Sequence, residues 1–292
     1  MPQVDVAINV YGKPMQTAVA LLTLLQHSGQ HIGRIWFIEE RRQPFGARFD
    51  ALKQALHDRL VVFKPTFHLG LRMLPFRWLY HVGPVRRSLR YQVAWERSER
   101  RYLFLLHNDV LFHGDLIGAM LDHMPGPIAV GPVGQCWNCS AHSAGQCSPE
   151  RFMDFRPTYQ EWLLVSTMYP GRRSDQYDWI IDARQPWPLP ECRVNEWATL
   201  IDLDIARPAT LPNGPAVPLG AMHDLDIGTA WFHTVLNQGH RVQHFAIEPY
   251  ARHAWASSTG GGHAALSDPE EYDRSEERAR VHLSEHFPRF LD

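Results

Sequence analysis

The chain has very little lysine and no excess of charge of either sign. Only three lysines stand against 26 arginines in 292 residues, so a single arginine is weak evidence of function. The 29 basic and 31 acidic side chains nearly cancel. Because no overall field attracts a polyanion, we expect no nucleic-acid partner.

Long apolar runs are also missing. The longest, residues 17–25, has nine residues, which is too short to span a membrane, and it lacks a cleavage-site pattern. We therefore expect a cytoplasmic protein. With 45% hydrophobic and 11% aromatic residues, the chain can still bury a substantial core, as one large α/β domain or two closely fused halves.

The first half alternates short β-type runs with helical patterns, which is typical of parallel strands joined by crossover helices. Beyond Pro125, prolines, cysteines and irregular polar stretches dominate before regularity returns. The predicted strands are residues 4–10, 35–38, 60–63, 102–106 and 242–247, with a strand or hairpin at 195–205. The predicted helices are residues 14–28, 44–57, 85–97, 224–237 and 268–286.

The most continuous apolar strand pattern, residues 102–106, leads directly into His107, Asn108 and Asp109. In open α/β sheets, ligands bind at the carboxyl ends of the strands, where loops converge. An imidazole and a carboxylate two residues apart can share a divalent cation, Mn or Mg, that neutralises a diphosphate. The alternative is that Asp109 simply caps a turn after a strand.

This strand and its polar end resemble the Asp-any-Asp element of glycosyltransferases with the GT-A fold, especially the family 2-like ones, with His107 in the first position. The resemblance implies an α/β, Rossmann-like fold whose mixed central sheet is flanked by helices. It implies metal binding by Asp109, and less directly by His107. It also implies transfer of a sugar from a nucleoside diphosphate, a UDP-sugar being favoured, to a hydroxyl of a glycan or lipid-linked acceptor, with inversion.

Donor-binding residues follow from the same resemblance, in the order the family requires. Asn9, Val10 and Tyr11 follow the first strand, where the base and ribose would lie, and Glu39 and Glu40 follow the second. Arg87, Arg90 and Tyr91 precede the metal motif and would line the diphosphate, with Asn108 beside it. The alternatives are turn packing for Tyr11, solvated loop charges for the glutamates and a helix surface for the arginines.

Two later segments complete the resemblance. Asp224, in the run from Gly220 to Asp226, stands where inverting members have the general base that deprotonates the acceptor hydroxyl. It could instead cap a helix, and Asp226 could equally be the functional acid. Either His253 or His263 could complete the metal shell; we favour His253 because it follows a predicted strand directly.

The four cysteines have the spacing of a structural metal site. Cys136 and Cys139 form a Cys-x-x-Cys pair, and Cys147 and Cys192 could close a tetrahedron around zinc, or His142 could replace one of them. The surrounding Gly, Ser, Asn and His residues are poor core material. A disulfide pair, or four unrelated thiols, are the alternatives.

A stretch between Asp58 and Glu96 has no acidic residue but many arginines and aromatics. It could rest on a membrane surface as a peripheral contact at the inner face, or grip the pyrophosphate of a lipid-linked acceptor. We favour the alternative, a solvated helix and loop in an arginine-biased chain.

We predict three segments and one leading function. Residues 1–131 would form the nucleotide-sugar-binding half, 132–193 a cysteine-rich insertion, and 194–292 the acceptor-binding half with a terminal helix. The alternatives to a glycosyltransferase are a non-catalytic binding or scaffold protein and a sugar nucleotidyltransferase. A sugar nucleotidyltransferase needs a glycine-rich loop after the first strand to bind a triphosphate, and this chain has only Gly12 there.

Overall fold

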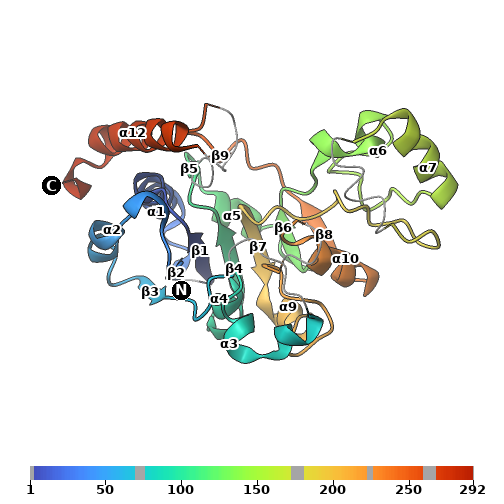
Figure 1. The fold of residues 1–292 in the computed structure, drawn as a ribbon, viewed down its shortest axis with the longest axis horizontal. Helices are drawn as coiled ribbons and strands as arrows, with labels where there is room; N and C mark the ends of the chain where they lie inside the picture. Colours follow the sequence, from blue (N-terminus) through green and yellow to red (C-terminus); the bar gives the residue numbers. More distant parts are fainter. Residues whose placement is uncertain (1–2, 70–75, 172–180, 222–225, 259–267, 292) are drawn as a thin grey trace.

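The computed structural model describes residues 3–69, 76–171, 181–221, 226–258 and 268–291 (Figure 1). Its centre is a seven-stranded sheet with the strand order β3-β2-β1-β4-β7-β6-β8. Helices flank this sheet, and a separate two-stranded sheet, β5-β9, lies beside it (Figure 1). The predicted fold class, a mixed α/β fold with a mixed central sheet flanked by helices, is confirmed.

Four parallel strands make up the first half of the sheet: β1 (Val4–Val10), β2 (Ile32–Glu39), β3 (Leu60–Phe63) and β4 (Tyr102–Leu106). β4 is buried along its whole length, as expected of an apolar run covered on both faces. Ile8 pairs with Leu106, so β1 and β4 end at the same edge of the sheet. The polar residues that follow these strands are therefore neighbours.

The second half makes the sheet mixed. β7 (Ala198–Asp202) runs antiparallel to both β4 and β6 (Ala129–Gly131), and β8 (Val242–His244) is parallel to β6. Chain from the carboxyl-terminal third thus completes a sheet begun by the amino-terminal third. The boundaries at residues 131 and 193 remain predictions.

The first helix and the last helix pack together (Figure 1). They are α1 (Pro14–Ser28) and α12 (Pro269–His286). Glu276 caps α1 from outside, because its carboxylate accepts the backbone N–H groups of Met15 at 2.8 Å and Gln16 at 3.2 Å. These amides are orphan donors of a helix start and favour a negative partner.

Two predicted helices are broken, and the break has the same cause in each. In place of a helix at 44–57, η1 (Pro44–Gly46) and α2 (Asp50–Ala55) are separated, and Phe45 has φ of +52°. In place of a helix at 85–97, α3 (Gly83–Arg86) and α4 (Gln92–Arg97) are separated by Tyr91 with φ of +65°. A left-handed residue cannot continue a right-handed helix.

Several other predicted elements differ in extent. β2 is longer than the strand expected at 35–38, and β8 ends at His244 although the strand was expected to reach residue 247. The strand expected at 195–205 is β7 followed at once by α9 (Leu203–Ala209). The helix expected at 224–237 is α10 (Thr229–Asn237), which begins later because residues 226–228 form a turn that ends in Gly228 with φ of +83°. The remaining elements are β5 (Val110–Phe112), β9 (Ala251–His253), α5 (Leu116–Leu121), α6 (Ser140–Ser143), α7 (Tyr159–Met168), η2 (Arg77–His81), η3 (Cys136–Asn138) and η5 (Pro288–Phe290).

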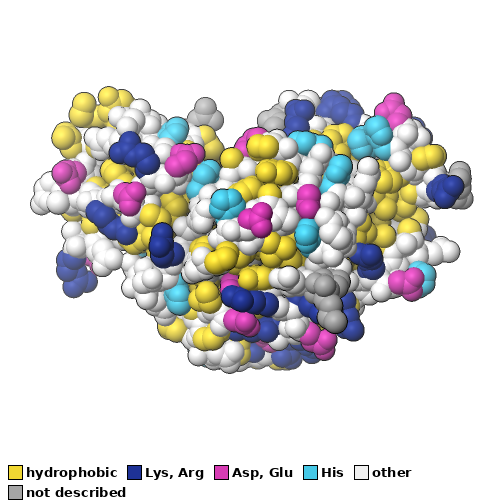
Figure 2. Space-filling view, turned by 180° about the vertical axis from the view of Figure 1, so that it is seen from behind, with side chains coloured by type: hydrophobic (Ala, Val, Ile, Leu, Met, Phe, Trp, Pro, Cys, Tyr) yellow, Lys and Arg dark blue, Asp and Glu magenta, His cyan; other side chains and the backbone are white. Residues whose placement is uncertain are grey.

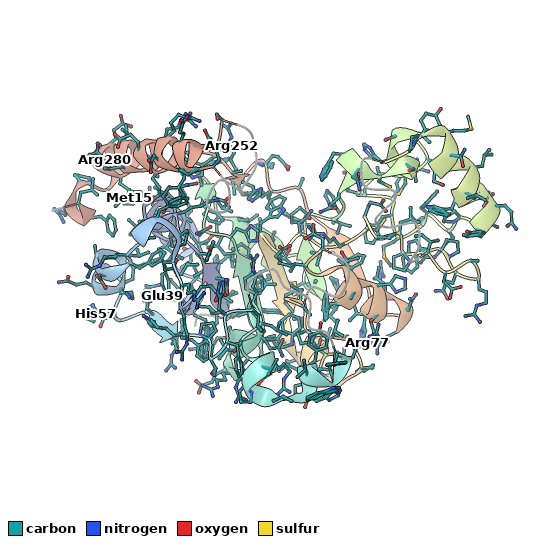
Figure 3. The ribbon with its side chains drawn as sticks, in the orientation of Figure 1. Met15, Glu39, His57, Arg77, Arg252 and Arg280 are labelled. Carbon is teal, nitrogen blue, oxygen red and sulfur yellow. The ribbon has the colours of Figure 1, made fainter. Side chains whose placement is uncertain are left out.

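The molecule has two lobes on one side of the sheet. α6 and α7 form one lobe, and α12 lies over the other (Figure 1). The space-filling view shows a notch between two lobes, and histidine and acidic side chains lie on the face between them (Figure 2). Arg77, in the basic and aromatic stretch, lies at the opposite edge from Arg252 on β9 (Figure 3).

None of the helices in the described ranges combines the length and apolar character needed to cross a bilayer.

Candidate metal and nucleotide site

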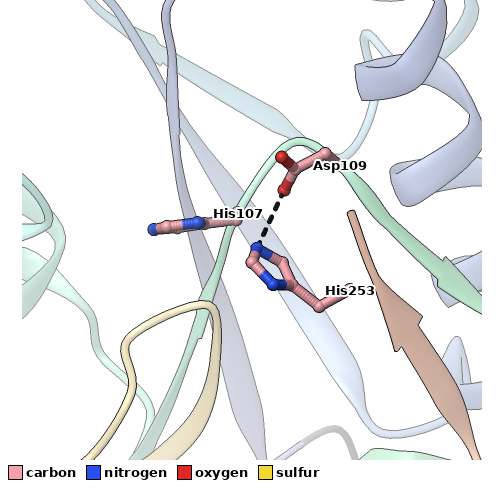
Figure 4. Close-up of side chains that lie close together, drawn as sticks. All are labelled: His107, Asp109 and His253. Carbon is pink, nitrogen blue, oxygen red and sulfur yellow. Dashed lines mark ion pairs between the residues drawn. The ribbon is translucent and has the colours of Figure 1, made fainter. Parts of the chain in front are cut away.

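The small sheet joins two predicted metal ligands that lie far apart in the sequence. β5 begins directly after Asp109, and its first residue, Val110, pairs with His253 on β9. Asp109 Oδ1 and His253 Nε2 are 3.4 Å apart (Figure 4). With His107, they are the one group of three or more His, Cys, Asp or Glu residues, among those the structure describes, whose ligand atoms all lie within 4.8 Å of one another.

The chemistry of this cluster, His107, Asp109 and His253, fits a divalent cation. Asp109 Oδ1, His107 Nε2 and His253 Nε2 are all buried, and their only close polar contacts among the described residues, Asp109 with His253 at 3.4 Å and His107 with Glu196 at 3.3 Å, lack hydrogen-bond geometry. Buried polar atoms without partners are costly, and such atoms in a native site call for an ion or water to satisfy them. Two imidazoles and one carboxylate suit Mn²⁺ as a ligand set.

A buried ammonium holds the other oxygen of the same carboxylate. Lys13 Nζ lies 2.7 Å from Asp109 Oδ2, and the two side chains are only 6% and 3% exposed. Burial alone would raise the pKa of Asp109, but the ammonium of Lys13, with a smaller contribution from the neighbouring His253, holds the pKa well below its usual value. Asp109 is therefore ionised, with Oδ2 taken by lysine and Oδ1 directed at His253.

A second buried carboxylate orients His107. Glu196 Oε1 lies 3.3 Å from His107 Nε2, while Arg193 donates to Glu196 Oε2 at 2.9 Å. Burial opposes ionisation of Glu196, but Arg193 and His107 lower its pKa strongly. Burial also lowers the pKa of His107, an effect that Glu196 partly offsets. His107 is thus neutral near pH 7, the form that binds a metal.

Trp197 fixes the other imidazole. Its ring stacks on His253 with 4.6 Å between centroids and 11° between planes. The residue next to Glu196 in the sequence therefore supports the second histidine of the cluster. Neighbours that orient metal-binding imidazoles are part of a metal site, since they set ring position and basicity.

Three of the predicted donor-binding residues lie at the carboxyl edge of β1, β2 and β4. Asn108 Nδ2 donates to the carbonyl of Gly12 at 3.1 Å, and Asn9 Nδ2 lies 3.5 Å from Glu40 Oε1. The ring of Tyr11 stacks on His68, 6.1 Å between centroids. Asn9 Oδ1 is buried without a partner, and so could accept a hydrogen bond from a ligand.

The other predicted donor residues lie elsewhere or in other contacts. Val10 is buried in the core. Glu39 is bound by Lys53 at 3.0 Å and by Lys64 at 3.4 Å, so Glu40 rather than Glu39 lies beside Asn9. Arg87 lies 3.7 Å from Glu96, and Arg90 makes a backbone bridge to Gly220. Their roles in donor binding remain predictions.

The predicted base, Asp224, lies outside the described residues, as does His263. The chain on either side of residues 222–225 is close to the site. An added Cβ at Gly220 would lie 2.3 Å from the carbonyl oxygen of Arg90, so only glycine permits this approach. On the other side, Asp226 Oδ2 accepts hydrogen bonds from Arg193 at 3.0 Å and Gln135 at 2.7 Å.

The four cysteines lie together, away from the cluster of His107, Asp109 and His253. All four are free thiols and line one small cavity. Their sulfurs do not form a group of three within 4.8 Å, which among the described residues occurs only at the His-Asp-His cluster. Structural zinc therefore remains a prediction.

Four residues of the site were not foreseen from the sequence: Lys13, Arg193, Glu196 and Trp197. The sequence could have indicated a role for Lys13, because it is one of only three lysines and lies between a predicted strand and a predicted helix. Arg193 and Glu196 are three residues apart in an irregular segment, where spacing alone indicates nothing.

No family model and no curated protein sequence match this chain. Among solved structures, residues 1–349 of TarS from S. aureus are 10% identical over 97% of this chain and 66% of that one, just under two thirds of its length, with a TM-score of 0.44. A mannosyltransferase from Pyrobaculum calidifontis with GDP-Man and Mn²⁺ is 11% identical over 98% and 76%, with a TM-score of 0.43. Mouse xyloside xylosyltransferase 1 is 11% identical over 84% of each chain, with a TM-score of 0.42. Likenesses of this size carry no argument about activity.

Proposed function

We propose that this chain is a divalent-metal-dependent glycosyltransferase that moves a sugar from a nucleoside diphosphate, a UDP-sugar being favoured, to an acceptor hydroxyl. The observation that carries the proposal is the cluster of Asp109, His107 and His253. The ligand atoms of these three residues lie within 4.8 Å of one another, just beyond the carboxyl ends of β1 and β4, where open α/β sheets bind nucleotides.

The chain's own residues would hold the donor as follows. Asp109, His107 and His253 would bind Mn²⁺ or Mg²⁺, which when bound neutralises charge on the departing diphosphate. The buried ammonium of Lys13 adds a fixed positive charge at the same place. Asn9 and Tyr11 would contact the base and ribose, and of the two glutamates expected there, Glu40 rather than Glu39 would supply the acid. Arg87, Arg90 and Asn108 remain candidates for the diphosphate.

Asp224 would accept the proton of the acceptor hydroxyl as that oxygen attacks the anomeric carbon, giving inversion. Asp226 is a weaker candidate, because Arg193 and Gln135 already bind one of its carboxylate oxygens. The acceptor would be a glycan or a lipid-linked molecule. The four cysteines would take no part in transfer, because four thiolates around an ion leave no open position.

Nucleotide binding measured by calorimetry, with and without Mn²⁺, tests this proposal. UDP or GDP should bind in a Mn²⁺-dependent manner, and His253→Ala should weaken that binding by more than about tenfold. His57→Ala is the matched control, since His57 is 72% exposed and pairs with Asp58, which is 86% exposed. Failure of both nucleotides to bind with Mn²⁺ would contradict the proposal.

A donor-hydrolysis assay separates the enzyme from a non-catalytic binding protein. A glycosyltransferase slowly transfers its sugar to water when Mn²⁺ is present, so a panel of UDP- and GDP-sugars should yield free sugar from at least one member. Mn²⁺-dependent nucleotide binding with no hydrolysis of any donor, and no transfer, would favour the binding protein instead.

A further inference from the structure

The chain enters and leaves the lobe that carries α6 and α7 through two adjacent segments, which we call its neck, and apolar side chains of the lobe also pack against α10 (Figure 1). At this neck the incoming and outgoing chains run side by side. The backbone N–H of Gly134 donates to the carbonyl of Arg193 at 2.8 Å, and that of Gln135 donates to Glu191 at 2.8 Å. Cys136 lies at the entry of the lobe and Cys192 at its exit, so residues 56 apart in the sequence are held together.

All four cysteines line one cavity at this neck. The cavity has a volume of about 10 Å³, and its lining also includes His142 and Glu191. That volume is close to the least that a single water molecule or ion requires. Cys139, Cys147 and Cys192 are 3%, 8% and 5% exposed. Every cysteine of the chain lines this cavity, together with apolar residues such as Val133 and Phe152. Its set of thiols is the composition of a structural metal site.

The backbone around Cys136 and Cys139 forms a tight turn of the kind that presents two sulfurs to one ion. η3 spans Cys136–Asn138, and the N–H of Cys139 donates to the carbonyl of Cys136 at 3.2 Å. Burial raises the pKa of the Cys139 thiol, and the nearby backbone of His142 and Ala141 partly offsets that rise. Amides that donate to thiolate sulfurs stabilise metal-bound cysteine and hold it in place.

We propose that Cys136, Cys139, Cys147 and Cys192 bind one zinc ion that closes the neck of this lobe. Four thiolates would complete a tetrahedron, so the ion would be structural. Because the sulfurs are spread more widely than bound thiolates, binding would draw them together toward Zn–S distances of about 2.3 Å. The lobe has few regular elements of its own, and the ion would supply part of its folding free energy.

The zinc ion would also affect the position of residues that support the cluster of His107, Asp109 and His253. Cys192 is followed by Arg193, which donates both to Glu196 and to Asp226. Fixing Cys192 therefore fixes the arginine that holds Glu196 against His107. The cysteine side chains themselves do not take part in the contacts that link Arg193, Glu196 and His107.

Metal analysis of the full chain, purified without added metal or chelator, tests the proposal directly. We expect about one zinc per chain, four thiols that become titratable only when zinc is released, and intense visible bands of tetrahedral thiolate coordination after exchange for Co²⁺. These measurements need no variant. Iron with cluster absorbance, two disulfides in protein isolated from a reducing cytosol, or chain without bound metal would each overturn the proposal.

Substitutions then assign the ligands. Cys139→Ser and Cys192→Ser should lose the zinc and the Co²⁺ bands, whereas His142→Ala should retain both, although His142 lines the same cavity. His253→Ala should also retain the zinc, which separates this site from the one at Asp109. Loss of zinc in His142→Ala or His253→Ala, with retention in the cysteine variants, would contradict the assignment.

Discussion

The buried ion pair between Lys13 and Asp109 makes a quantitative prediction possible. Both side chains are at least 94% buried and their charged atoms are 2.7 Å apart. Removal of one partner takes away the nearest opposite charge from the other, and breaking a buried pair in this way costs up to about 3–5 kcal/mol. Lys13→Met and Asp109→Asn should each therefore lower the free energy of unfolding by about that amount. The corresponding drop in Tm is about 6–20 °C for a chain of this size.

The double variant should recover most of the loss. With both charges gone, neither methionine nor asparagine leaves an unpaired ion, so the double variant should be within about 2 kcal/mol of the parent chain. The coupling energy of the cycle should then exceed about 3 kcal/mol. Urea unfolding of the four proteins measures it.

A surface pair supplies the control for this cycle. Arg48 and Asp50 are separated by 2.9 Å but are 84% and 62% exposed, so the same substitutions there should show little coupling. If the two single variants at Lys13 and Asp109 stay within about 1 kcal/mol of the parent, the pair is not buried as described. Mn²⁺ should stabilise Lys13→Met but not Asp109→Asn, because only the second variant lacks the ligand.

The remaining predictions concern the supports of the site. Glu196→Gln should weaken Mn²⁺ binding by about 10–100-fold while the metal-free protein still folds, because the group that orients His107 is weakened; an unchanged affinity in calorimetry would contradict this. Glu271 accepts the N–H and hydroxyl of Ser258 at 2.6 and 2.7 Å, and these bonds lower its pKa to about 2. Its contribution to stability should thus be present above its usual pKa and be lost as the pH falls toward about 2. Glu271→Gln should lower the Tm at pH 7 and flatten that acid dependence, and parallel melting curves for both proteins at all pH values would refute the assignment.

Local patterns were sufficient for the parallel half of the fold. β1, β3 and β4 have the predicted bounds because each is a short apolar run flanked by residues that end a strand. The broken helices could not be predicted in the same way. Phe45 and Tyr91 take left-handed conformations that their residue types do not favour, so tertiary contacts, not local preference, set those conformations.

The candidate site could also be predicted only where local sequence patterns were sufficient. His107 and Asp109 are adjacent to one strand and needed only the rule that ligands bind at strand ends. His253 was favoured because it follows a predicted strand, but its meeting with Asp109 depends on β5 pairing with β9 across more than 140 residues of sequence. Lys13 and Glu196 reach the cluster through burial and side-chain direction, which no spacing in the sequence encodes.

The charges around the cluster argue that metal and nucleotide bind together. Lys13 balances Asp109 and Arg193 balances Glu196, while the two imidazoles contribute no negative charge. The residues around the metal site therefore have a net charge close to zero. A divalent ion bound there would keep its positive charge uncompensated until a diphosphate binds beside it. Each ligand should then bind weakly alone and more tightly in the presence of the other, and by linkage the two enhancements must be equal.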